Sequence, residues 1–402
     1  MANSLTQVGG PAIAPPGANK AQSMVPFRQA STGRTTQLQT SAGTNVGTAV
    51  NSFDVVIEGS GFIYGIDLDY TVTCAANAAA VAYFEDAPWS TYPSIVFRDV
   101  NGELINLPGI SLRFANLYGA YTGRTAQLAW NPYTTPPVPA TATSPDPSIA
   151  YLSATVGPGD GGSYRMHLQV PVGLNRRNLW GILANQDRAQ KYSLRTDIAS
   201  AAAAAAGPIY TTAPTTQGTY TLVRTYENYA VPGPSDANGN KQQQLPPQHG
   251  IVNFWTQSVN PAAPVPGTVN HYLARLGNTI RNIILVYRTG AVATGRAAAE
   301  ALLPTRIQFN LGDTPIFVEA PGYRRNLMLS RYGFNAPQGV FNYDFLTDFD
   351  LGAGAEMGDD YLWTSGLVNA QFAISYPAGV ATASLTVITG DSLIPPNVNI
   401  YG

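Results

Sequence analysis

The sequence predicts an all-β protein made of two tandem eight-stranded jelly-roll sandwiches, with short helices in loops and an extended N-terminal arm. Three observations predict this fold. One stretch of alternating apolar and polar residues occurs twice. Short segments with the same period-two alternation recur through both halves of the chain. The length of 402 residues is enough for two or three domains.

The repeated stretch runs from Ser94 to Gly119 and again from Arg306 to Gly333. Each copy alternates around a turn, which is typical of paired strands. The shared anchors are Ile95 with Ile307, Phe97 with Phe309, Pro108-Gly109 with Pro321-Gly322, and Tyr118-Gly119 with Tyr332-Gly333. A tandem duplication would place Ile95 and Ile307, and likewise Phe97 and Phe309, in the cores of two similar domains on equivalent strands. Chance similarity between two β-rich segments is the alternative.

Composition divides the chain into four parts: an arm at residues 1–50, a first jelly roll at 51–235, a linker at 236–248 and a second jelly roll at 249–402. The arm is rich in Gly, Pro, Thr, Gln and Asn and has no hydrophobic period. The linker is the segment richest in turn-forming residues between two strand series. Long loops rich in Pro, Gly or Ala are expected at 120–162 and 199–218.

The arm contains three basic residues, Lys20, Arg28 and Arg34, and no acidic residue precedes Asp54. The chain as a whole has a formal net charge of −2. A solvated flexible tail would explain the pattern. The alternative, which we adopt as a hypothesis, is an arm whose three basic residues face something anionic.

In the first half, strands are expected in order along the chain. They are Phe53–Glu58, Phe62–Thr73, the two strands of the first repeat copy, Tyr164–Val170, Lys191–Ile198 and Thr219–Tyr229. In the second half they are Ile251–Trp255, Thr279–Arg288, the second repeat copy, Val340–Leu346, Ala370–Tyr376 and Thr382–Thr389. Seven or eight strands per half, with long excursions between some of them, favour jelly rolls over simple hairpin meanders.

Two short helices are predicted in the connecting segments. Asn175–Asn185 has Leu179, Ile182 and Leu183 at helical spacing, and Asn175 is a suitable N-cap. Thr294–Leu303 begins at a capping Thr294 and is followed by Pro304.

Charged residues make up only 11% of the chain, against about 25% in ordinary soluble domains. The chain has 22 Tyr, and its basic residues are almost all Arg. Interfaces deplete Lys and Glu and enrich Tyr and Arg, so this composition indicates a surface that is largely covered by other subunits. A GC-rich codon bias would produce the same excess of Arg and stays open.

Composition also excludes several classes. The net charge and a pI of about 5.9 argue against a general polyanion binder, and we expect no sequence-specific nucleic acid as a partner. The N-terminus lacks the architecture of a secretory signal. No apolar run reaches the 18 or more residues of a membrane-spanning helix.

The sequence predicts no catalytic residue, no metal and no cofactor. Cys74 is the single cysteine, and the three histidines, His167, His249 and His271, lack metal-ligand spacing. Asp67 and Asp69 share one face of a predicted strand, where an exposed edge explains them better than catalysis. We therefore expect that the protein is not an enzyme.

Two further acidic groups do not form sites. Asp236 to Asn240 begins like a calcium loop, but Lys241 stands at the sixth position and Pro247 at the twelfth. Asp359 and Asp360 are adjacent, so their carboxylates do not face one another as a glycosidase pair must.

A family resemblance is carried by the segment from Val170-Pro171 through Leu179-Trp-Gly181 and Ala184-Asn185 to Tyr192–Ile198. It resembles a stretch of the first jelly roll of tectivirus-type major capsid proteins, which belong to the double jelly-roll lineage that also includes adenovirus. Pro337-Gln-Gly-Val-Phe-Asn-Tyr343 is similar to an element of the second jelly roll of that family. The resemblance spans most of residues 50–390.

The resemblance implies a major capsid protein. It implies homotrimeric, pseudo-hexagonal capsomers that form the lattice of an icosahedral virion with an internal membrane. It further implies penton proteins, minor capsid proteins and the inner viral membrane surface as partners, with assembly in the host cytoplasm and location in the virion shell. Pro11, Pro15 and Pro16 depart from the family's often helical N-terminal segment.

Two other function classes compete with this hypothesis. A phage receptor-binding or carbohydrate-binding β-sandwich protein would expose aromatic residues in loops, and Trp89 and Tyr92 are the candidates. A β-sandwich hydrolase would need a convergent pair of acids, which the sequence does not show.

Overall fold

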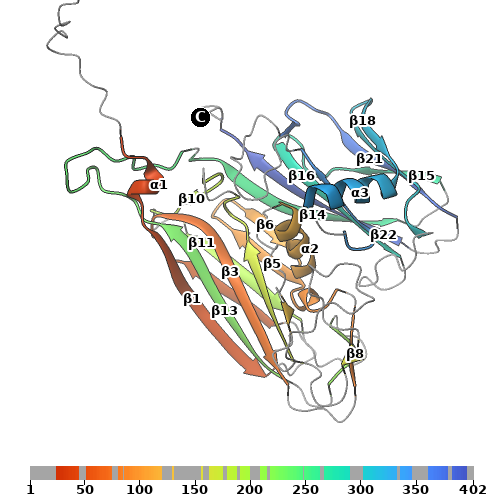
Figure 1. Cartoon of the computed structure of the whole chain (residues 1–402), viewed down its shortest axis with the longest axis horizontal. Helices are drawn as coiled ribbons and strands as arrows, with labels where there is room; N and C mark the ends of the chain where they lie inside the picture. The colour runs from red at the N-terminus through yellow and green to blue at the C-terminus, as the bar shows by residue number, and fades with distance from the viewer. Residues whose placement is uncertain are drawn as a thin grey trace, which may run out of the picture.

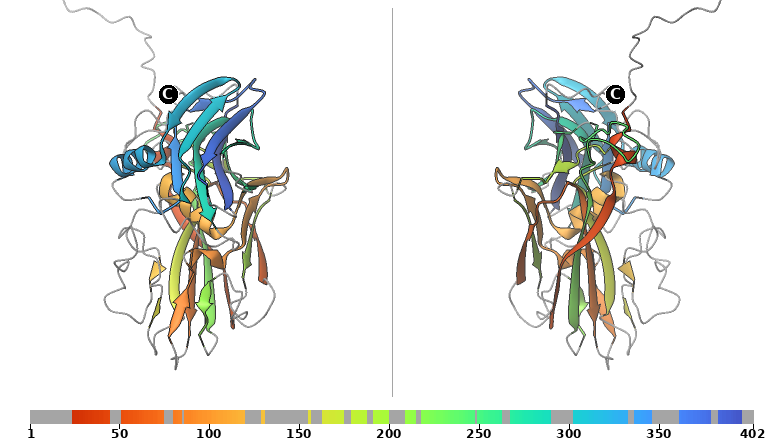
Figure 2. Two further views of the ribbon diagram at one scale, coloured as in Figure 1. Left: turned by 90° about the vertical axis from the view of Figure 1, so that its right-hand side faces the viewer. Right: turned by 90° about the vertical axis from the view of Figure 1, so that its left-hand side faces the viewer.

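The computed structural model describes residues 24–44, 51–74, 80–84, 86–119, 129–130, 155–156, 163–174, 179–187, 191–199, 209–214, 218–247, 249–262, 267–289, 302–332, 336–345, 361–378 and 383–395. Two β-sandwiches follow one another along the chain (Figure 1). The first, in red to green, and the second, in teal to blue, lie at opposite ends of the elongated molecule (Figure 2).

The first sandwich consists of two sheets of four long strands. One sheet has the order β1 (Gly33–Thr44), β13 (Thr219–Tyr229), β3 (Phe62–Thr73) and β9 (Tyr164–Val170). The other has the order β2 (Asn51–Ile57), β11 (Tyr192–Ile198), β5 (Ser94–Arg98) and β6 (Glu103–Leu107). The short strands are β7 (Ala129–Trp130) and β10 (Leu183–Ala184) on the first sheet, and β4 (Val81–Tyr83), β8 (Thr155–Val156) and β12 (Tyr210–Thr212) in a separate small sheet.

The second sandwich repeats this arrangement. One sheet has the order β14 (Val252–Ala262), β22 (Ala383–Leu393), β16 (Thr279–Thr289) and β19 (Val340–Asp344), with β20 (Leu362–Trp363) beside β16. The other has the order β15 (Gly267–Tyr272), β21 (Ala370–Tyr376), β17 (Arg306–Leu311) and β18 (Thr314–Glu319). Taken in chain order, the strands have the same neighbours in both sandwiches, so the fold is two tandem jelly rolls, as the sequence predicts.

The duplicated stretch occupies the same place in each jelly roll. Strands β5 and β6 form the same hairpin as β17 and β18, at the end of the corresponding sheet. Ile95, Phe97, Ile307 and Phe309 are all fully buried. The prediction of inward-facing residues on equivalent strands is confirmed.

Each hairpin leads directly into a helix that the sequence analysis did not assign. In the first jelly roll these are α2 (Gly109–Phe114) and a continuing π-helical turn, η2 (Ala115–Gly119). In the second it is α3 (Pro321–Tyr332). The Pro-Gly anchors of the repeat therefore mark helix starts, where the fixed φ of proline suits the first turn.

Many strand bounds agree with the sequence prediction. Phe62–Thr73, Tyr164–Val170, Thr219–Tyr229 and Ala370–Tyr376 have the predicted ends. The predicted helix at Thr294–Leu303 lies outside the described residues apart from its last two positions, and Asp359-Asp360 lies outside them as well.

The predicted helix at Asn175–Asn185 is wrong over its described part. Leu179 and Gly181 have positive φ values of 57° and 77°, which an α-helix cannot contain. Leu183 and Ala184 pair instead with β3 as strand β10. Pairing with the sheet overrides the helical spacing of the apolar residues.

The predicted arm also needs a correction. We expected an extended segment up to residue 50, but Gly33–Thr44 forms β1 and pairs along its length with β13. A four-residue helix, α1 (Phe27–Ala30), precedes it. The sequence does not predict β1 because it is an edge strand with mostly exposed side chains and therefore shows no apolar alternation.

Candidate assembly interface

The two jelly rolls meet where β6 of the first joins β14 of the second. The two strands run parallel, with Trp255 opposite Ile105, so a nine-stranded sheet continues through both sandwiches. Each of these strands would otherwise be a sheet edge with unpaired backbone groups. The contact joins the β6 edge of one jelly roll to the first strand of the next at this residue pair, which is a head-to-tail arrangement.

The helical segment after β6 fills the angle between the sandwiches. Asn116 holds it on the first jelly roll, since its side-chain amide donates to the carbonyl of Gln169 at 2.7 Å and its oxygen accepts from the Gln169 N–H at 3.0 Å. Toward the second jelly roll, Arg281 donates to the carbonyl of Gly119. A Cβ at Gly119 would lie 2.0 Å from the ring of Trp255, so only glycine allows this approach.

A second set of contacts comes from the segment after β9. The side-chain amide of Asn253 donates to the carbonyl of Val172 at 2.8 Å, and the Ser392 hydroxyl donates to Asn253 Oδ1 at 2.7 Å. Asn253 needs Gly181 beside it, because a Cβ there would lie 1.8 Å from the Asn253 amide nitrogen. These buried polar groups fix the orientation of one jelly roll against the other.

A buried ion pair also crosses the junction. Arg288 on β16 donates to Asp86 of the first jelly roll, and both side chains are buried. The repeat copies themselves meet nearby, with the ring centroids of Tyr118 and Tyr332 5.1 Å apart in edge-to-face geometry. These two residues are the corresponding anchors of the duplicated stretch.

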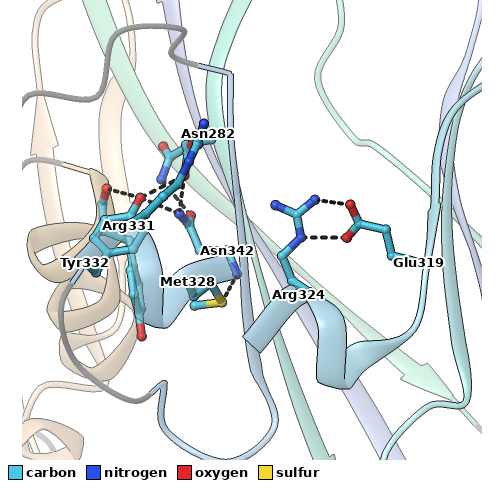
Figure 3. Close-up of polar contacts among 9 residues, drawn as sticks. Asn282, Glu319, Arg324, Met328, Arg331, Tyr332 and Asn342 are labelled. Carbon is cyan, nitrogen blue, oxygen red and sulfur yellow. Dashed lines mark hydrogen bonds and ion pairs between the residues drawn. The ribbon is translucent and has the colours of Figure 1, made fainter. Parts of the chain in front are cut away.

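Helix α3 is held on its own jelly roll by one face (Figure 3). Arg324 makes a two-point contact with Glu319, at 2.7 and 2.6 Å. The Asn342 side-chain amide donates to the Tyr332 hydroxyl at 2.7 Å, and its backbone N–H donates to Met328 Sδ at 3.2 Å. The buried residues Arg324, Met328 and Tyr332 recur every four positions, which is the spacing of one helix face.

The opposite face of α3 and the neighbouring β18 expose large apolar side chains. They are Ile316, Val318, Tyr323 and Leu329. Phe317, between the first two, points the other way and stacks on Tyr343 at 4.5 Å. Large exposed apolar side chains on the hairpin strand and on the following helix are candidates for contacts with another protein.

The predicted arm residues fall partly within the described structure. Lys20 lies outside it. Arg28 on α1 and Arg34 on β1 are exposed. The Val25 N–H donates to the carbonyl of Lys241 at 2.9 Å and the Gln243 N–H to the carbonyl of Val25 at 3.0 Å. Phe27 packs in a small cluster with Phe62, Tyr64, Leu179 and Ile182. The described part of the arm is therefore fastened to the linker and to the first jelly roll.

Asp67 and Asp69 have basic partners on the neighbouring strand. Arg165 contacts Asp69 at two points, 3.0 and 2.5 Å, and His167 Nε2 lies 3.4 Å from Asp67 Oδ1. The Asp67 contact raises the pKa of His167. Both carboxylates lie on the outer face of the sheet, as predicted, but β3 lies between β13 and β9 and is not an edge strand.

The linker carboxylate Asp236 is used by its own turn. Its Oδ1 accepts from the N–H groups of Asn238 and Asn240, each at 2.8 Å, and its Oδ2 accepts from the Asn240 side chain. The Asn240 contacts are the main cause of the lowered pKa of Asp236. Burial raises the pKa of Cys74 to about 11, so its thiol is unreactive at neutral pH.

The candidates for glycan stacking are not on the surface. Trp89 and Tyr92 are both buried in the core of the first jelly roll. Within the described residues, no group of three or more His, Cys, Asp or Glu could hold a metal ion, and no helix is long and apolar enough to cross a membrane.

Comparison with solved structures decides the fold. No family model matches the sequence, and no curated protein matches it. The crystal structure of the major capsid protein of STIV, the Sulfolobus Turreted Icosahedral Virus, matches 90% of this chain and 97% of its own, with a TM-score of 0.58 and 12% identity. This chain has the double jelly-roll fold of viral major capsid proteins.

Two further double jelly-roll structures agree. The PBCV-1 virus capsid matches 90% of this chain and 93% of its own, with a TM-score of 0.57 and 12% identity. The major capsid protein of bacteriophage PM2 matches 92% of this chain and 100% of its own, with a TM-score of 0.51 and 11% identity. The resemblance predicted from the sequence is thus confirmed for the fold. This chain matches each of the three solved structures over most of that structure's length.

Proposed function

We propose that this protein is the major capsid protein of a virus and acts as a structural subunit of the virion shell. The observation that carries the proposal is the head-to-tail junction, in which one chain joins two equivalent jelly rolls through a continuous sheet. The three solved structures compared above are viral capsid proteins or capsids, which supports the proposal. The role is structural, and no enzymatic activity belongs to the proposal.

The subunit assembles as a homotrimer. Two similar jelly rolls per chain allow three chains to approximate six-fold symmetry, which fills a hexagonal lattice. A head-to-tail contact that closes on rotation forms a ring rather than a filament. The low charge of 11% and the 22 Tyr suit a surface covered by neighbouring subunits.

The trimers build an icosahedral shell around an internal membrane, with penton and minor capsid proteins at specialised positions, after assembly in the host cytoplasm. The arm faces inward, and Lys20, Arg28 and Arg34 contact the anionic membrane surface. Each such residue contributes on the order of 1 kcal/mol near an anionic bilayer. Many copies on a lattice add these weak contacts through avidity.

Sedimentation velocity and negative-stain imaging of the purified protein test the proposal. We expect a trimer at micromolar concentration that buries more than about 2,000 Å² per chain, as obligate interfaces do, and hexagonal outlines in the images. A stable monomer at all concentrations, with no particles under any salt condition, would reject a capsid role.

The arm is tested separately with the triple variant Lys20→Gln, Arg28→Gln, Arg34→Gln. Trimers should stay intact, while flotation with vesicles containing anionic lipid or the yield of membrane-containing particles should fall. The control replaces Lys191, Lys241 and Arg306 with Gln, since these are exposed basic residues outside the arm. Normal assembly of the arm variant around membrane would reject the electrostatic role alone.

The receptor-binding or carbohydrate-binding alternative gains no support. Its sequence candidates, Trp89 and Tyr92, are buried and cannot stack on a sugar. No observation on the described residues favours it over a shell subunit.

A further inference from the structure

Strand β13 places a positive charge inside the first jelly roll. Its inward-facing residues include Tyr220, Leu222, Arg224 and Tyr226, all of which are buried. The two Tyr residues and Leu222 belong to the hydrophobic core, and Arg224 between them is 0% exposed. An arginine side chain stays protonated in proteins, so the core of this sandwich contains a full positive charge.

The protein satisfies only part of this guanidinium group. Its Nη2 donates to the hydroxyl of Ser41 on β1, and its central carbon lies 5.5 Å from the centroid of the Phe53 ring on β2. The other two nitrogens, Nε and Nη1, are buried and have no hydrogen-bond partner. Buried charges in proteins are normally paired with an opposite charge, because burial without a partner is costly. Arg224 has no such pair in the described part of the chain.

The pKa of Arg224 reports the same imbalance. Burial is the largest influence on this pKa and lowers it, and the groups that oppose the decrease are Tyr92 and Tyr220. No carboxylate of the described residues is among them. The nearby groups are therefore neutral hydroxyls.

A buried arginine of the second jelly roll shows what is missing. Arg324 also lies over aromatic rings, with its guanidinium carbon 5.5 Å from the centroid of Phe317 and 4.1 Å from that of Tyr343. Its charge is compensated by the carboxylate of Glu319, which accepts two hydrogen bonds at 2.7 and 2.6 Å. Arg224 has a ring beside it but lacks the two-point acceptor.

Tyr92 supplies a further donor near Arg224. Its side chain is 1% exposed, and its hydroxyl has no hydrogen-bond partner. Burial raises the pKa of Tyr92 well above its usual value, so the hydroxyl keeps its proton and cannot be the counter-charge. Arg224 opposes this rise, which means that the hydroxyl lies within electrostatic range of the guanidinium. The cluster thus has donors and a positive charge but no negative acceptor.

We propose that Arg224 and Tyr92 bind a monovalent anion of the size of chloride between the two sheets of the first jelly roll. The ion accepts from Nε and Nη1 of Arg224 and from the Tyr92 hydroxyl. It supplies the negative charge that Glu319 supplies to Arg324 in the second jelly roll. The site belongs to the fold of one chain, so it does not depend on the proposed shell function.

The charge and position of the cluster favour a halide over a larger anion. One guanidinium compensates one negative charge, whereas phosphate or sulfate would bring a surplus charge and four oxygens that need donors. The two residues that contact Arg224 from the side, Ser41 and Phe53, lie on β1 and β2, and each of these strands ends its sheet in the described part of the chain. The ion can therefore enter between two sheet edges.

The direct test is crystallography of the wild-type protein in sodium bromide. Bromide replaces chloride in such sites and scatters anomalously. We expect an anomalous peak within hydrogen-bond distance of Arg224 Nε or Nη1. A water molecule in that position without anomalous signal, or a carboxylate of the chain itself, would overturn the proposal.

A second test measures stability in solution by urea unfolding. The unfolding equilibrium constant of the wild type should be at least about 10-fold smaller in about 0.3 M sodium chloride than in sodium gluconate of the same ionic strength, which corresponds to a dissociation constant of about 30 mM. Gluconate is too large for the site. Equal stability of the wild type in the two salts would contradict a bound halide.

Variants assign this chloride dependence to the cluster. Arg224→Met should abolish it, and the milder Tyr92→Phe, which keeps the ring, should reduce it if Arg224→Met does not fold. Arg324→Met is the control for a buried guanidinium that already has a carboxylate. Tyr287→Phe is the control for Tyr92, because Tyr287 is fully buried and its hydroxyl also has no hydrogen-bond partner. Both controls should keep the full chloride dependence, and a dependence that persists in Tyr92→Phe and Arg224→Met would place the ion elsewhere.

Discussion

Helix α2 with its continuation η2 and helix α3 follow the same hairpin in the two jelly rolls, yet one is enclosed and the other is half exposed. Every residue from Ser111 to Gly119 is buried, whereas only Pro321, Arg324, Met328 and Tyr332 are buried on α3. The difference lies in the neighbour, because the second jelly roll covers α2 while nothing in the described chain covers the outer face of α3. Equivalent elements of a repeat can therefore have different surroundings while the strand order stays the same.

The glycines at the start of the two helices differ too, and this second difference comes from the packing inside each jelly roll. A Cβ at Gly109 would lie 2.3 Å from the carbonyl oxygen of Trp89, whereas a Cβ at Gly322 would meet nothing within 4 Å. The first glycine is required by packing. Gly322 keeps the Pro-Gly motif although its surroundings would accept a side chain.

The largest expected effect tests whether the two cores are equivalent. Phe97→Ala and Phe309→Ala should each lower the free energy of unfolding by about 3–5 kcal/mol, because both rings are fully buried. Phe309 lies among Phe317, Phe345 and Phe372, and Phe97 stacks on Tyr192. Urea denaturation measures the change, with the exposed Val100→Ala as control. A large loss at only one of the two positions would break the equivalence.

The next effect tests the junction between the two regions. Arg288→Met should destabilise the protein by about 3 kcal/mol, because it breaks the buried ion pair that Arg288 makes with Asp86 across the junction. Adding Asp86→Asn should recover part of the loss. Arg306→Met, at an exposed position on β17, is the control. Thermal and urea unfolding measure the stability of all three variants. An unchanged stability in Arg288→Met would mean that the ion pair does not stabilise the junction.

A smaller pair of effects sharpens the helix comparison directly. Gly109→Ala should cost about 1–3 kcal/mol through overpacking against Trp89 and Tyr92. Gly322→Ala should be neutral or stabilise by up to about 1 kcal/mol, because alanine restricts the unfolded chain and fits the open space. The two single variants serve as each other's control. Equal effects would contradict the difference in surroundings.

The smallest effects concern pH, since two histidines, one in each jelly roll, should respond oppositely to acid. Burial lowers the pKa of His271, which contacts the Tyr376 hydroxyl at 2.9 Å. The unfolded chain therefore binds a proton near pH 6.5 that the folded chain resists, and stability falls as pH drops through that value. His271→Phe should lose less stability than wild type between pH 8 and pH 5.

His167 has the opposite sign. Asp67 raises its pKa, so its contribution is present below about pH 6.5 and disappears as pH rises through the folded-state value. His167→Gln should cost under about 1 kcal/mol at pH 5.5, because the pair is partly exposed, and nothing at pH 8.5. If the stabilities of the His167 and His271 variants, relative to wild type, changed in the same direction with pH, the opposite pKa shifts would be contradicted.

Sequence reasoning located the strands that are buried on one face. Thr219–Tyr229 was predicted with both ends right because its residues alternate between buried and less buried along its length. Strand β1 could not be found in this way. Its position at the sheet edge leaves Arg34 to Gln37 exposed on both faces, so the sequence carries no apolar period.

The junction was only partly predictable. The repeat anchors did mark the hairpins and Tyr118 and Tyr332, but α3 was missed although Arg324, Met328 and Tyr332 follow at four-residue spacing after Pro321. That signal was present. The contact of Trp255 with Gly119, and the positive φ at Leu179 that replaces a helix, depend on residues distant in the sequence. No local sequence pattern predicts this contact or this backbone angle.

The long-range contacts of the N-terminal segment mean that it can fold only after distant parts of the chain have been synthesised. The Ser31 hydroxyl donates to the carbonyl of Ala230, a separation of 199 positions, and Val25 bonds to Lys241 and Gln243. Strand β1 leaves the ribosome before β13 and cannot pair until β13 has followed it. Long-range pairing of this kind slows folding and leaves strand edges exposed in the meantime. A nascent chain halted before residue 219, where β13 begins, should therefore still present β1 unpaired to other chains or chaperones.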